Sequence, residues 1–216
     1  MKLNACREEI AYFMRRLYEQ GLTTTSGGNL SVRFAENKIL ITPSGSDKGR
    51  MKGSEIGVMD MEGNPITKFK PSIEVSMHLM IYRARPDIDA IVHAHPVVAS
   101  AFAATDAKIN FRLLAESYAV LGRPAYAPYL LMGTKKLAEA VAKSAKTANC
   151  VVMKNHGILT VGKTLLEAFD RLEVLETCAK MTLIADGLLK DRTSLLNKAD
   201  LADLDRLMRR KVINHI

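Results

Sequence analysis

Hydrophobic residues recur at helical spacing in several stretches of the chain. In each stretch apolar residues lie three or four positions apart, which is the period of a helix with one buried face. Gly21 and Pro86 follow two of these stretches as stop signals, and Ser72 is placed to cap the start of another. We therefore expect helices over residues 4–20, 72–84, 96–104, 134–146 and 164–188.

Other stretches have short apolar runs that indicate strands. Residues 29–42 read as a β-hairpin turning at Glu36-Asn37-Lys38, and residues 55–67 as a second pair of short strands. A strand is expected over 88–95 and two more within 149–162, whereas residues 110–132 show no clear period. Because helices and strands mix without regular alternation or repeats, we expect a sheet covered by helices rather than a doubly wound parallel fold. No linker divides the chain, so residues 1–216 are expected to form a single domain.

The composition is that of a globular protein, with 48% hydrophobic and 25% charged residues. The formal charge of +8 is compatible with nucleic acid or with a small anionic substrate. However, the cations are spread along the chain without a basic block, so a generic basic surface is expected and nucleic acid is not. Since the N-terminus lacks an apolar segment and no run of about 18 apolar residues occurs, we expect neither secretion nor a membrane span.

The three cysteines, Cys6, Cys150 and Cys178, have no Cys-x-x-Cys spacing and cannot all pair. They therefore indicate a reducing compartment, and the cytoplasm is the expected location. Cys150 and Cys178 lie in apolar patterns typical of core packing.

Two histidines flank one alanine in the segment IVHAHP at residues 91–96. Side chains alternate along a strand, so His93 and His95 would point to the same side. His156 ends another apolar run and precedes Gly157. Three imidazole ligands leave a position open for water or substrate, as in a catalytic zinc site, although solvated histidines at strand ends are an equally open interpretation.

Glu74 lies in the first turn of a predicted helix, where backbone N–H groups favour an anion. His78 follows one turn later on the same face, so the two residues are either a base with its support or a surface contact. We do not include His78 among the metal ligands.

Two turns rich in small residues, TTTSGGNLS (23–31) and TPSGS (42–46), could bring backbone N–H groups close to a phosphate. Neither has the spacing of a nucleotide-binding P-loop. A small phosphorylated or polyhydroxy substrate is the better fit.

The motifs SGGNLS, TPSG, PSIE, HAH and NHG occur in this order, and in this the chain resembles the class II aldolase and adducin family over about residues 5–190. This resemblance implies a three-layer α/β/α sandwich around a mostly antiparallel sheet. It also implies a homotetramer with sites at subunit interfaces. Within the family, the fuculose-1-phosphate aldolase-like enzymes are the most similar.

Carried over from the family, three histidines look like ligands of one Zn²⁺ per subunit, or of another divalent transition metal, and Glu74 looks like the catalytic acid/base. The zinc ligands are His93, His95 and His156, and the residues at substrate phosphate positions are Gly28, Asn29, Ser44, Gly45 and Ser72.

The chain departs from the aldolase pattern at three points. Ile73 replaces a second serine before the glutamate, so one phosphate-binding hydroxyl is missing. The C-terminal tail DRLMRRKVINHI lacks the tyrosine of the aldolase. Tyr118 is only a loose candidate for the tyrosine that the aldolase takes from a neighbouring subunit.

The resemblance implies reversible cleavage of a ketose 1-phosphate, similar to L-fuculose 1-phosphate, into dihydroxyacetone phosphate and an aldehyde. Within the family, a ribulose-phosphate 4-epimerase and a methylthioribulose-phosphate dehydratase are alternatives. A non-catalytic module like the adducin head and a plain zinc hydrolase are alternatives of other classes. The retained histidines and Glu74 argue against the module, and the phosphate loops argue against the hydrolase.

Overall fold

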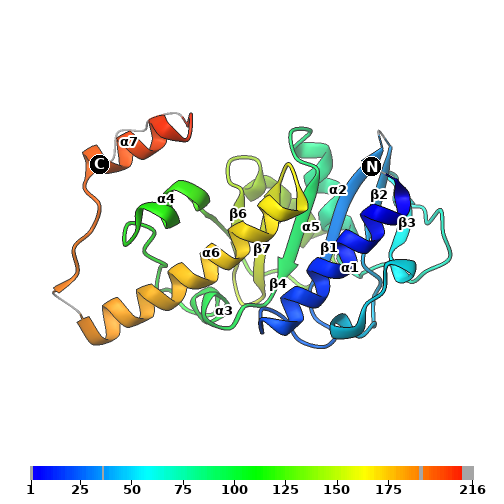
Figure 1. The fold of residues 1–216 in the computed structure, drawn as a ribbon, viewed down its shortest axis with the longest axis horizontal. Coiled ribbons are helices and arrows are strands. Elements are labelled where there is room, and N and C mark those ends of the chain that lie inside the picture. Colours follow the sequence, from blue (N-terminus) through cyan, green and yellow to red (C-terminus); the bar gives the residue numbers. More distant parts are fainter. Residues whose placement is uncertain (1, 36, 190–191, 211–216) are drawn as a thin grey trace.

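Seven strands form one sheet at the centre of the computed structural model, which describes residues 2–35, 37–189 and 192–210 (Figure 1). The strand order is β3-β2-β1-β4-β7-β6-β5. Neighbours pair antiparallel throughout, except for the parallel pair β5 and β6 at one edge. The strands are β1 (Asn29–Ala35), β2 (Lys38–Ile41), β3 (Gly57–Asp60), β4 (Ala90–Ala94), β5 (Ala125–Ala127), β6 (Cys150–Met153) and β7 (Gly157–Gly162).

Helices cover both faces of the sheet and complete the expected three-layer sandwich. One apolar core lies between the sheet and α1, α3 and α6, and a second lies between the sheet and α2 and α5. In Figure 1, α1 and α6 lie in front of the sheet, whereas α2 and α5 lie behind it. The α-helices are α1 (Leu3–Glu19), α2 (Val75–Ala84), α3 (Val97–Ala103), α4 (Ala115–Leu121), α5 (Lys135–Ala145), α6 (Leu165–Ile184) and α7 (Lys198–Leu207), and the short helical turns are η1 (Lys48–Arg50), η2 (Gly53–Glu55) and η3 (Ala185–Leu189).

Strand β4 lies in the middle of the sheet and is buried along its whole length. Val92 packs into the core under α1, α3 and α6, whereas Ile91 packs into the core under α2 and α5. A strand that is apolar on both faces is expected where both faces are covered by helices. This burial fixes the strand that carries the first two histidines.

The predicted helices and most predicted strands are confirmed, with three differences. The pair of strands expected over 55–67 is wrong, because β3 is followed only by a single bridge between Met59 and Pro65, and proline has no N–H to extend a ladder. Helix α2 begins at Val75 with Glu74 as its N-cap, so Ser72 is not the cap. The ambiguous stretch 110–132 contains α4 and β5.

Among the described residues, none of the helices combines the length and apolar character needed to cross a bilayer. All three cysteines are buried and unpaired, as expected for thiols that contribute to packing. Glu36 of the predicted hairpin turn and residues 211–216 of the tail lie outside the described residues.

Candidate metal centre and active site

The three histidines singled out in the sequence lie together at one end of the sheet. His93 is in β4, His95 directly follows that strand, and His156 lies in the turn between β6 and β7. One ring nitrogen from each lies within 4.8 Å of the other two. Small rotations of these side chains would bring the nitrogens to the distance at which they can share one ion. The three predicted ligands are therefore near enough to one another to hold one metal ion.

The turn that carries His156 depends on two backbone features. Asn155 has a positive φ of 53°, which asparagine tolerates better than most residues. At Gly157 a Cβ atom would lie 2.7 Å from Cδ2 of His95 and 2.8 Å from the carbonyl oxygen of Ala94. Glycine is therefore needed for His95 and His156 to approach each other.

A buried carboxylate fixes the segment that follows His95. Both carboxylate oxygens of Glu176 on α6 accept hydrogen bonds from the first N–H groups of α3, those of Val98 and Ala99, at 3.2 and 2.8 Å. Such a contact satisfies donors that a helix leaves unpaired at its start. It anchors α3 and, through it, the end of the histidine strand.

The ring of His93 is oriented for metal binding. Its Nδ1 donates to the carbonyl oxygen of Ile158 at 2.8 Å, so in the neutral ring Nε2 carries a lone pair. Nε2 is buried and has no hydrogen-bond partner among the described residues, although Oε2 of Glu74 lies 3.2 Å away. Two atoms with lone pairs at this distance need a cation or a proton between them. The donor set therefore fits a divalent transition metal.

Glu74 lies in the same cluster, with Oε1 2.9 Å from Nε2 of His156. Its other oxygen accepts a hydrogen bond from the side-chain amide of Asn29 at 2.9 Å. Burial alone would raise the pKa of Glu74, but the positive charge of a protonated His93 and the polar contacts of His156, His93 and Asn29 lower it overall. The carboxylate is thus held ionised next to the histidines.

His95 is uncharged at neutral pH. Burial, followed by the nearby charges of His93 and His156, lowers its pKa to about 4. A neutral imidazole is the form that binds a metal.

Behind Glu74 lies a buried polar network that sequence analysis did not predict. Nε2 of His78 donates to Oδ1 of Asn29 at 2.6 Å, and Nδ1 of His78 accepts from the hydroxyl of Ser31, also at 2.6 Å. The hydroxyl of Ser31 also contacts that of Tyr82 at 2.9 Å. Burial, with the charge of His93, lowers the pKa of His78 to about 3, so this ring is neutral. His78 therefore supports Asn29 and is not a surface partner of Glu74.

A cavity of about 180 Å³ opens beside Glu74 and the histidines. Residues from both loops of small residues line this cavity, together with most of the predicted site residues. Gly28 has a positive φ of 69°, and a Cβ atom there would lie 2.7 Å from the carbonyl oxygen of His93. The lining residues are Ser26, Gly27, Gly28, Asn29, Pro43, Ser44, Lys48, Ser72, Ile73, Glu74, His95, Met132 and His156. Gly45 lies next to Ser44 in the same loop, but it does not line the cavity.

Lys48 is a residue of this cavity that the sequence did not reveal. Its side chain is almost fully buried, and its ammonium group donates to the carbonyl oxygen of Pro43 at 2.8 Å and to the hydroxyl of Ser46 at 3.2 Å. Burial lowers the pKa of Lys48 to about 8, against a smaller opposing effect of Glu55. A buried cation therefore holds the loop that presents Ser44.

Tyr118, the loose candidate for a tyrosine at a neighbouring subunit, is buried in its own chain. Its hydroxyl donates to Asp205 of α7 at 3.1 Å. We therefore do not assign it to a neighbouring site. Ile73, which replaces a serine of the family pattern, lies at the cavity with 57% of its surface exposed.

Comparison with known proteins identifies the family to which the chain belongs. The family model described as Class II Aldolase and Adducin N-terminal domain matches residues 8–183. An L-fuculose phosphate aldolase from Methanocaldococcus jannaschii is 39% identical over 178 residues, covering 82% of this chain and 96% of the relative. A 3-oxo-tetronate 4-phosphate decarboxylase from Haemophilus influenzae is 34% identical over 206 residues, covering 93% and 96%. A solved structure of L-fuculose 1-phosphate aldolase superposes with a TM-score of 0.83 at 35% identity, covering 94% of this chain and 95% of that one.

Proposed function

Because the chain belongs to the class II aldolase and adducin family, whose matched relatives are aldolases and decarboxylases, we propose that it cleaves the carbon–carbon bond between the α and β carbons of a small phosphorylated carbonyl compound. Our proposed reaction is the reversible conversion of a ketose 1-phosphate, similar to L-fuculose 1-phosphate, into dihydroxyacetone phosphate and an aldehyde. The observation that carries this proposal is the buried contact of Glu74 with His93 and His156.

Class II aldolases are metal-dependent, and His93, His95 and His156 are the residues that would hold the ion. We propose zinc, since three neutral imidazoles suit it and leave a position open for substrate. When bound, the metal supplies a Lewis acid that polarises the ketose carbonyl.

Glu74 would move the proton that this cleavage requires. The bond between C3 and C4 breaks, its electron pair moves toward the carbonyl at C2, and the C4 hydroxyl loses its proton as the aldehyde forms. C3 then gains one proton, which Glu74 delivers, so the overall reaction neither consumes nor releases protons. Asn29 donates to Oε2 of Glu74 and thereby orients the carboxylate for this transfer.

The anionic end of the substrate would lie in the cavity beside the two loops. Backbone N–H groups and small side chains suit a phosphate there, and Lys48 adds a positive charge to the wall. The proposed phosphate-binding residues are Gly28, Asn29, Ser44, Gly45 and Ser72, together with Lys48.

A second candidate reaction is decarboxylation of a 3-oxo acid phosphate. It is supported by the coverage of the alignment with one decarboxylase. The 3-oxo-tetronate 4-phosphate decarboxylase aligns over 93% of this chain, compared with 82% for the aldolase. The chemistry differs only in the group that leaves, because loss of CO₂ from the four-carbon substrate yields the same three-carbon ketose phosphate. The replacement of the family's serine by Ile73 does not distinguish the two reactions, because both substrates carry a phosphate.

We further propose that residues 1–216 act as one domain within a cytoplasmic homotetramer whose sites lie at subunit interfaces. The free buried cysteines support a reducing compartment. Ile73 and Met132 support an interface, because both line the cavity while more than half of their surface is exposed.

The test is to assay the purified protein for consumption of dihydroxyacetone phosphate with lactaldehyde, and separately for release of CO₂ from 3-oxo-tetronate 4-phosphate. We expect Glu74→Gln to lower kcat by at least about 100-fold while zinc content is retained. Glu62→Gln, at an exposed turn, serves as the matched control and should be fully active. Full activity of Glu74→Gln, or no reaction with either substrate, would overturn the proposal.

A further inference from the structure

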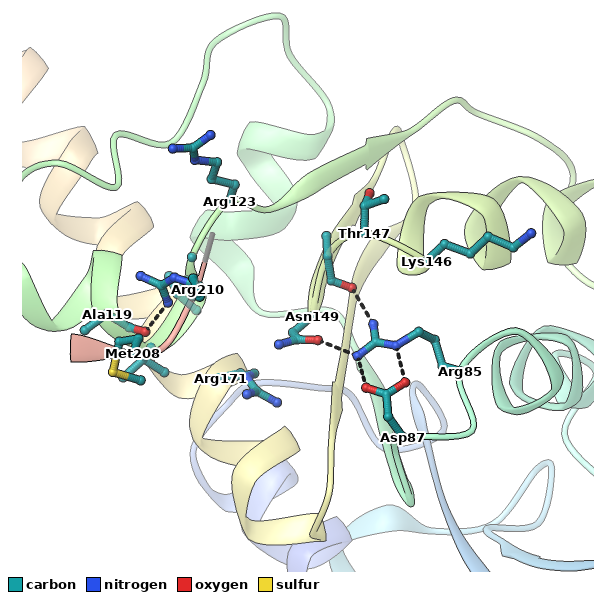
Figure 2. Close-up of a pocket in the computed structure, with 14 residues that line it drawn as sticks. Arg85, Asp87, Ala119, Arg123, Lys146, Thr147, Asn149, Arg171, Met208 and Arg210 are labelled. Atoms are coloured by element: carbon teal, nitrogen blue, oxygen red, sulfur yellow. Dashed lines mark hydrogen bonds and ion pairs between the residues drawn. The ribbon is translucent and has the colours of Figure 1, made fainter. Parts of the chain in front are cut away.

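A second cavity, of about 390 Å³, opens at the opposite end of the sheet from the histidines (Figure 2). Arg85 and Asp87 precede β4, and Asn149 precedes β6, whereas the histidines lie at or beyond the other ends of these strands. Five residues of β4 at about 3.3 Å each separate the two ends by roughly 16 Å. This cavity is therefore separate from the lyase site.

Positive charge dominates the lining of this second cavity. Asp87 is the one carboxylate among the lining residues, and both of its oxygens accept from Arg85 at 2.7 Å. Two further carboxylates, Glu167 and Asp205, pair with lining arginines from outside the cavity. The cationic lining residues are Arg85, Arg123, Lys146, Arg171 and Arg210. They outnumber the paired carboxylates, so a net positive potential remains.

Two lining side chains, Arg171 and Asn149, also carry further nitrogen donors. Nε of Arg171 is buried and has no hydrogen-bond partner within the part of the chain that the structure describes, although its terminal nitrogens contact Val161 and Glu167. Asn149 uses its oxygen to accept from Arg85 at 3.0 Å. Figure 2 shows the amide nitrogen of Asn149 on the side turned away from Arg85. An unpaired buried donor beside a cavity is costly unless a ligand satisfies it.

We propose that this cavity binds a small phosphorylated anion at a site distinct from the lyase centre. Guanidinium groups match phosphate oxygens in both charge and geometry, and they bind them more strongly than neutral donors do. The volume is in the range of small-molecule sites and is about twice that of the lyase cavity. The ligand is therefore an ester of phosphoric acid or phosphate itself, held by the field of the cationic lining residues and by the Asn149 amide.

The test is a titration of the ¹⁵N-labelled, metal-loaded protein with inorganic phosphate at constant ionic strength, followed by NMR. We expect saturable shifts of the Arg171 Nε–H and Asn149 side-chain signals. The backbone N–H of Gly45, which adjoins the cavity residue Ser44, reports separately on phosphate in the lyase cavity. In the double variant Arg123→Gln/Lys146→Gln, the dissociation constant read at Asn149 should rise by at least about tenfold, with the Gly45 response unchanged.

Lys135→Gln provides the matched control, because Lys135 starts α5 whereas Lys146 follows its end. This variant removes one positive charge, as the Lys146→Gln change does, but from the opposite end of the same helix, and it should bind phosphate like the wild type. The proposal is overturned if the Arg171 and Asn149 signals do not move, whether or not Gly45 responds. It is also overturned if the double variant and Lys135→Gln bind equally well at Asn149.

Discussion

A single side chain, the amide of Asn29, connects the imidazole of His78 to the carboxylate of Glu74. The amide oxygen accepts from His78 at 2.6 Å, and its nitrogen donates to Glu74 at 2.9 Å. Because the pKa of His78 is about 3, the ring stays neutral and its Nε2 proton holds the amide in one orientation. The predicted catalytic carboxylate is thus oriented by a histidine that it does not touch.

Replacing His78 by leucine should therefore affect turnover more than substrate binding. Without the Nε2 donor the Asn29 amide can rotate, so we expect kcat to fall by about tenfold with little change in KM. Unfolding by urea should show a loss of about 1–3 kcal/mol, because Ser31 and Asn29 lose buried partners. Tyr82→Phe removes the far end of the same network and should cost about 1 kcal/mol with kcat unchanged. Equal kcat values for the two variants would contradict a positioning role.

Removal of metal should abolish activity and lower the melting temperature. A ligand that binds only the folded chain stabilises it in proportion to the logarithm of its concentration over its dissociation constant. We expect chelator-treated protein to regain both properties on addition of zinc, as measured by assay and by calorimetry. His93→Ala should bind less metal than wild type by elemental analysis. Full activity in protein free of transition metals would rule out the proposed centre.

Lys48 should make the protein more stable as the pH rises from 7 to 9.5. Its pKa is about 8 in the folded state, below the unfolded value of about 10.4, so the unfolded chain binds more protons in this window. The cost of burying the charge is present below pH 8 and is relieved above it. Relative to Lys48→Met, the wild type should gain about 2 kcal/mol in the free energy of unfolding. Denaturant titrations at both pH values measure this gain, and a pH-independent difference would contradict the burial of a charged lysine.

Ile73→Ser should restore a hydroxyl at the cavity and tighten phosphate binding. We expect the KM of the phosphorylated substrate to fall by about 3- to 10-fold, because one additional hydrogen bond to a charged group is worth about 1 kcal/mol or more. Met132→Ser is the matched control, since Met132 also lines the cavity and is similarly exposed. A fall in KM of the same size in both variants would indicate a general effect of polarity and not a restored contact.

Gly28→Ala should be more damaging than Gly45→Ala, although the two glycines have nearly the same positive φ, 69° and 67°. Both substitutions impose backbone strain of about 1 kcal/mol or more. A Cβ atom at Gly28 would also clash with the carbonyl oxygen of His93, whereas one at Gly45 meets no atom within 4 Å. We expect a larger loss of stability and of bound metal for Gly28→Ala. Calorimetry and metal analysis of both variants would check this, and similar losses would refute it.

Much of the secondary structure could be predicted because local signals agree with the tertiary fold. Gly21 and Pro86 lie close to the ends of α1 and α2, and the apolar periods match the buried faces of the helices. The start of α2 was missed because serine is a favoured N-cap residue, whereas the fold places Glu74 at the N-cap position without a side-chain capping hydrogen bond. The short strand β5 is held by its pairing with β6, which has no local signal.

The site could be predicted only in part, for a related reason. Motifs reveal residues whose chemistry is recognisable, such as His93 and Glu74. Lys48 has no such signal, because nothing in its neighbourhood along the chain indicates that a lysine would be buried. The basic cavity was missed in the same way, since Arg85, Arg123 and Arg171 come from distant segments. These charges are dispersed along the sequence and come together only in the folded protein.

The complete burial of β4 has a consequence for how such a protein can evolve. Its pairing partners fix the register on both sides, with Asn29 opposite His93 on β1 and Leu159 opposite it on β7. A shift by one residue would turn the imidazoles into the opposite layer of the protein and destroy the centre. The loops around the cavity are under no such constraint. Natural selection can therefore change which substrate the loops recognise, and even which fragment leaves that substrate, while the histidine cluster on the buried strand stays in place.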